Sequence, residues 1–135
     1  MKKSFVLMSC LVMMIGVLMA AGFAQGNKEE HKFKSPEVEQ FHNALHPVWH
    51  EQYPAKQWQK IRAQADELLK RKDAVMAVRL RVKPSAQAKA EETRKKFGEA
   101  VDAFSKTAKS GGDEELQKSV AAMHQAFEDF FDAVK

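Results

Sequence analysis

Apolar residues recur every three or four positions along most of the chain after residue 35, which is the spacing of one face of an α-helix. These runs predict four amphipathic helices. The first begins at Ser35-Pro36-Glu37, where a hydroxyl, a proline and an acid suit a helix start, and Pro54 separates it from the second. We therefore expect an all-α fold, an antiparallel up-down four-helix bundle, over residues 35–135.

Spacing of three and four residues defines the inward faces of the first and last predicted helices. These faces consist of Val38, Phe41, Leu45, Val48, Trp49 and Gln52 in the first helix, and of Leu116, Val120, Met123, Phe127, Phe130 and Val134 in the last. Residues 76–84 break the helical period, because Val78, Leu80 and Val82 alternate with basic residues. A two-residue period favours extended chain. We interpret this segment as a crossover loop, although the pattern leaves the end of the second helix open.

The first residues have the layout of a secretory signal. Two lysines follow Met1, residues 5–21 are almost entirely apolar, and Gly22-Phe23-Ala24 offers small residues for cleavage. We expect a signal peptide over 1–24 cleaved after Ala24, a flexible leader over 25–34 and a bundle domain over 35–135. The protein would be periplasmic or secreted, with no stable membrane insertion after cleavage.

Cleavage also changes the chemistry that the chain can carry. It removes two lysines, so the net charge falls from +4 to +2, too balanced to favour nucleic acid. It removes Cys10, the only cysteine, so disulfides and thiolate metal sites are excluded. The chain has no Gly-rich phosphate loop, no nucleophile motif and no HExxH sequence, so we do not expect an enzyme.

The stretch "GGDEELQKSVAAMHQAFEDFF", residues 111–131, resembles the last helix of the cytochrome c′ family, in which a short Gly-Asp-rich turn leads into a helix bearing Cys-x-x-Cys-His. In that register Val120 and Met123 stand at the two haem-linking cysteines, and His124 stands at the iron-ligating histidine. The resemblance implies a four-helix bundle and a homodimer. The missing cysteines exclude the covalent haem of that family.

Histidines are the remaining candidate ligands. In "HNALHPVWH", residues 42–50, three of them lie four residues apart, so His42 with His46, or His46 with His50, can share one metal ion. Pro47 can bend the helix and bring in His50. The last helix adds His124 and Glu128 one turn apart. The sequence thus predicts a Cu, Ni or Zn site at the seam of the first and last helices, serving metal carriage or sensing.

Two other interpretations use the same end of the bundle. Non-covalent haem could be held by His124 with His42 or His46, with Met123 one residue away from the ligand position. The chain could also be a ligand-free interaction or sensor domain, with an aromatic patch at Trp49, Tyr53 and Trp58. In that case the histidines are solvated or border the core.

Overall fold

A computed structural model describes residues 35–135, so the expected signal peptide and leader lie outside the described residues. The described chain forms helices and loops without a β-strand, which confirms the all-α prediction. None of these helices is both long and apolar enough to span a membrane. The elements are α1 (Pro36–Pro47), the π-helical η1 (Val48–Gln52), α2 (Trp58–Ala63), α3 (Ala65–Ala77), the 3-10 helix η2 (Pro84–Ala86), α4 (Gln87–Ser110) and α5 (Asp113–Val134).

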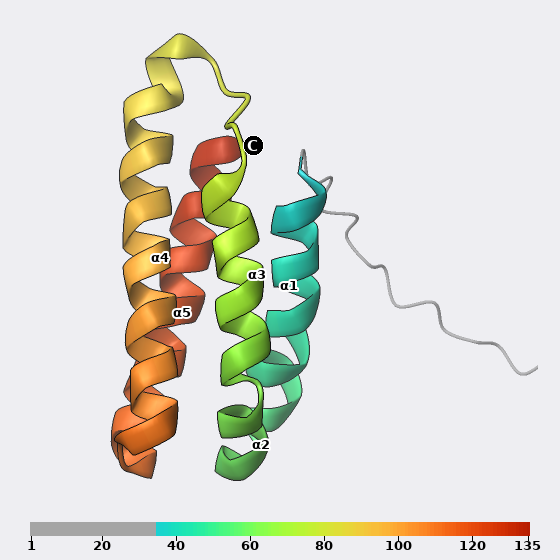
Figure 1. Ribbon diagram of the computed structural model, residues 1–135, viewed down its shortest axis with the longest axis vertical. Helices are drawn as coiled ribbons and strands as arrows, with labels where there is room; N and C mark the ends of the chain where they lie inside the picture. Colours follow the sequence, from blue (N-terminus) through green and yellow to red (C-terminus); the bar gives the residue numbers. More distant parts are fainter. Residues whose placement is uncertain (1–34) are drawn as a thin grey trace, which may run out of the picture. The chain divides into compact units, whose positions relative to one another are not determined.

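The helices pack side by side, and successive long helices run in alternating directions (Figure 1). α4 packs against α3 and α5, and α1 packs against α3. The ring centroids of Phe41 on α1 and Phe127 on α5 lie 5.4 Å apart, which brings α1 against α5 as well. The chain passes from α4 to α5 through Gly111 and Gly112 alone, so these two helices are antiparallel neighbours.

Phenylalanine side chains fill the centre of the core. Phe41 meets Phe97 edge-on at 4.7 Å, and Phe97 stacks on Phe130 at 5.6 Å. The predicted inward faces of the first and last helices are buried, apart from partial exposure of Trp49, Gln52 and Val134. The 3.6-residue period therefore identified the core, because burial of one stripe of each helix is what stabilises the fold.

The second predicted helix is not continuous. Gln64 lies between α2 and α3, and its N–H bonds the carbonyl of Ile61, three residues back, in a tight turn. Arg62 in this turn reaches across to the end of α4, where it donates to the carbonyl oxygens of Thr107 and Ala108. It also donates to Asp113 at the start of α5, at 2.8 Å. This contact fixes α2 to the turn between α4 and α5.

The segment between α3 and α4 is extended, as the two-residue period predicted. Residues 79–83 belong to no helix or strand. The side chains of Val78, Leu80 and Val82 are half-buried against the helices, whereas those of Arg79 and Arg81 are exposed. The chain then forms the 3-10 turn η2 and continues directly as α4.

Candidate metal-binding site

Three of the predicted ligands form a row along α1 and η1. The imidazole centroids of His42 and His46 lie 5.9 Å apart, and those of His46 and His50 lie 4.4 Å apart. His42 is half-buried, whereas His46 and His50 are exposed. The structure therefore brings the three histidines together in sequence order, from the edge of the core out to solvent.

The close approach of His46 and His50 follows from the chain around Pro47. Proline cannot donate the backbone hydrogen bond that continues an α-helix, and the π-helical segment η1 begins at the next residue. There the N–H of Tyr53 bonds the carbonyl of Val48, five residues back, at 2.8 Å. A π-helical turn takes more residues than an α-helical turn, so each residue rotates less and His50 is turned back over His46. The helix thus changes from α to π geometry after Pro47.

The fourth histidine lies on α5 under an indole ring of η1. His124 stacks on Trp49 with ring centroids 4.0 Å apart and planes within 10°. Its Nε2 atom lies 3.7 Å from Oε1 of Glu128, one turn further along α5. The ring of His42 on α1 lies against that of Phe127 on α5, with the ring centroids 5.9 Å apart. His42 and Trp49 of the first helical segment therefore both contact α5, His42 at Phe127 and Trp49 at His124.

Burial is the main cause that lowers the pKa of His124 below the usual value for histidine, and the neighbouring His50 contributes in the same direction. Glu128 opposes both effects. The imidazole of His124 therefore favours its neutral form near pH 7, which is the form that binds a metal ion.

The donor atoms are suited in kind to Cu, Ni or Zn, because imidazole nitrogen with a carboxylate oxygen is a common ligand set for these ions. Within residues 35–135, no three histidine or carboxylate side chains stand in positions that could hold one ion without moving. His46 and His50 are exposed, so their rings are free of core packing and can rotate. Met123, the further ligand considered for haem, is fully buried in the core.

The structure adds side-chain contacts in this region that were not predicted from the sequence. Trp49 was assigned to the inward face, but its stacking on His124 has no signal in the sequence, because the two residues are far apart in the chain. Trp49 also stacks on Tyr53 at 4.7 Å, and Tyr53 meets Trp58 edge-on at 6.2 Å. These three half-buried side chains are a packed aromatic row rather than an open patch. Among the described residues, Gln52 of η1 has a buried Oε1 atom without a hydrogen-bond partner.

Comparison of the chain with protein-family models, with curated proteins and with solved structures finds no match. The resemblance of residues 111–131 to cytochrome c′ therefore stays a prediction. The assignment of function depends on the arrangement of the four histidines.

Proposed function

We propose that this protein binds one transition metal ion, Cu, Ni or Zn, through histidines of its first and last helices. His46 and His50 are the primary chelating pair, because their rings already lie 4.4 Å apart and both are exposed. This spacing, created by the π-helical turn after Pro47, is the observation that carries the proposal.

The other three residues have different parts in the proposed site. His124 is the third ligand, since burial lowers its pKa and favours the neutral imidazole. Glu128 either orients His124, whose Nε2 lies 3.7 Å from its carboxylate, or supplies an oxygen ligand. His42 is the inner member of the row, with its ring centroid 5.9 Å from that of His46, and is a further candidate nitrogen donor. Carriage or sensing of the ion suits a site at the surface with exposed ligands.

The architecture that frames this site is proposed to be an antiparallel up-down four-helix bundle related to cytochrome c′. In this view η1 extends α1, and α2 with α3 forms one helix broken at Gln64. After cleavage at Ala24 the protein would act in the periplasm or outside the cell, without a stable membrane anchor, and could form a homodimer. No catalytic role or nucleic-acid partner is proposed.

Metal analysis of the purified protein tests the proposal directly. The protein is purified without a metal-affinity tag, and its metal content and visible spectrum are recorded for wild type, His124→Ala and His42→Ala. We expect one equivalent of Cu, Ni or Zn in the wild type, and loss of the metal in His124→Ala. A Soret band would instead support non-covalent haem. A protein with neither metal nor haem would support the ligand-free interaction domain and contradict the proposal.

A haem bound at His124 would need room for a porphyrin beside the imidazole, where Trp49 already packs at 4.0 Å. The neighbouring core is also filled by phenylalanine rings that are fully buried. These contacts are the reason why we place a metal ion ahead of haem.

A further inference from the structure

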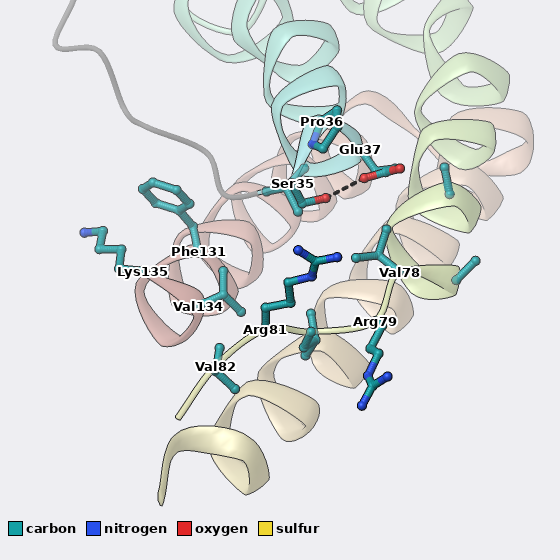
Figure 2. Close-up of a pocket in the computed structure, with 14 residues that line it drawn as sticks. Ser35, Pro36, Glu37, Val78, Arg79, Arg81, Val82, Phe131, Val134 and Lys135 are labelled. Carbon is teal, nitrogen blue, oxygen red and sulfur yellow. Dashed lines mark hydrogen bonds between the residues drawn. The ribbon is translucent and has the colours of Figure 1, made fainter. Parts of the chain in front are cut away.

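A hollow of about 620 Å³ lies among the start of α1, the end of α3, the end of α5 and the extended segment before η2 (Figure 2). It shares no residue with the histidine cluster. Its volume is within the range of small-molecule pockets. Most of its wall is apolar, and the side chains that form this wall are Val38, Ala74, Ala77, Val78, Leu80, Val82, Phe131 and Val134.

The charged groups around the hollow differ in whether they have partners. The carboxylate of Glu37 accepts a hydrogen bond from the Ser35 hydroxyl at 2.6 Å, and this bond lowers the pKa of Glu37, so its negative charge persists. Lys135 pairs with Asp132 at 2.5 Å. Within residues 35–135, Arg81 makes neither a hydrogen bond nor an ion pair with any protein group.

Figure 2 shows where the two arginines of the segment point. The side chain of Arg81 extends across the hollow toward Ser35 and Glu37 at the start of α1. The side chain of Arg79 points away from them; Arg79 borders both this hollow and a second one near Glu91 and Arg94, which Arg81 also borders. The hollow therefore combines an apolar wall with the guanidinium of Arg81, which extends across it.

We propose that this hollow binds a free amphiphilic carboxylate, a monoanion whose headgroup meets Arg81 and whose hydrocarbon tail lies on the apolar wall. The planar fork of a guanidinium matches a carboxylate with two parallel hydrogen bonds. Glu37 faces the same space and repels negative charge, which disfavours phosphate and other dianions. The half-buried Leu80 and Val82 offer the tail a surface on which each buried methylene strengthens binding.

Decanoate is the probe for this proposal, titrated into the full chain below its micelle concentration and followed by calorimetry and by amide NMR shifts. We expect saturable binding that shifts the amides of residues 78–82 and 134. Affinity should rise about two- to fourfold for each methylene between butyrate and decanoate, because a fully buried methylene contributes about 0.8 kcal/mol. Decylammonium, with a similar tail and the opposite charge, should bind more weakly than decanoate.

Three variants separate the proposed contact from general surface charge. Arg81→Gln should weaken decanoate binding about tenfold or more, since a hydrogen bond to a charged group is lost. Arg79→Gln is the matched control and should change the affinity less than about twofold at physiological salt, because its charge points elsewhere and is screened. Glu37→Gln should tighten binding by removing a repulsive charge. Circular dichroism checks that each variant is folded.

Several results would overturn the proposal. One is the absence of saturable decanoate binding. Another is an equal loss of decanoate affinity in Arg79→Gln and Arg81→Gln. Weaker binding in Glu37→Gln would mean that the carboxylate attracts the ligand. Binding only to phosphatidylglycerol vesicles, and not to decanoate, would identify an anionic membrane surface instead. None of these measurements depends on the histidines, so they stand apart from the metal proposal.

Discussion

Truncation of Trp49 to alanine is the perturbation that links the fold most closely to the candidate site. Trp49 is half-buried in η1 and stacks on His124 at 4.0 Å and on Tyr53 at 4.7 Å. A tryptophan buries up to about 250 Å². If about half of that area is lost from burial, the cost at 25 cal/mol per Å² is about 3 kcal/mol. The two ring pairs add about 0.5–1.5 kcal/mol each.

We therefore expect Trp49→Ala to lower the free energy of unfolding by about 4–6 kcal/mol, at or slightly above the roughly 3–5 kcal/mol typical of such truncations. Urea denaturation followed by circular dichroism measures this change. The same variant should raise the pKa of His124 toward its usual value, because removal of the indole exposes the imidazole and burial is the largest cause of the lowered pKa. Titration of the His124 ring protons by NMR measures this second effect.

Trp49→Phe is the matched control, because it keeps an aromatic ring against His124. It should retain most of the stability, with a loss of about 1 kcal/mol, and should shift the His124 pKa less than the alanine variant does. The reasoning would be refuted if Trp49→Ala unfolded within about 1 kcal/mol of wild type and left the pKa of His124 unchanged. Either result alone would show that the stacked pair contributes to only one of the two properties.

Three further predictions concern pH, the α2 contact and the core. The pKa of His124 is lower in the folded than in the unfolded chain, so the unfolded state binds more protons and the free energy of unfolding should fall as the pH drops below about 6.5. Between about pH 8 and pH 5 the urea midpoint should therefore fall less in His124→Gln than in wild type. A steeper fall in the variant would show that the pKa of His124 is raised rather than lowered by folding. Arg62→Met should lower the free energy of unfolding by about 2 kcal/mol, since it removes charge-assisted hydrogen bonds to Thr107, Ala108 and Asp113. An unchanged urea midpoint would show that these bonds do not form in solution. Phe127→Ala should lower the free energy of unfolding by about 3–5 kcal/mol, because it leaves a cavity in the aromatic core. A decrease of less than about 1 kcal/mol, measured by calorimetry, would contradict that packing.

Much of the fold could be predicted from local patterns in the sequence. The 3.6-residue apolar period placed the core, because one stripe of each helix must leave water. The alternation from Val78 to Val82 identified the extended segment, because neighbouring side chains of extended chain point to opposite sides. The break at Gln64 could not be predicted in this way, because residues 58–77 keep a helical apolar period across it.

The candidate site was predictable only in part. The four-residue spacing of His42, His46 and His50 placed them in one row, and Pro47 marked the place where the helix changes. The stacking of Trp49 on His124 could not be predicted, because it depends on how α1 and η1 pack on α5 and not on a local pattern. The same packing partly buries His124, and this burial lowers its pKa.

The central claim is that His50, turned toward His46 by the π-helical segment, is a metal ligand together with His124. Titration of the full chain with Cu(II), Ni(II) and Zn(II) by calorimetry, in wild type, His50→Ala and His31→Ala, tests it most directly. His31 lies outside the described residues and serves as the histidine control. We expect one tight site for one of the ions in wild type and in His31→Ala, and affinity about tenfold or more weaker in His50→Ala. Equal affinities for all three proteins, or no binding to any of them, would contradict the account.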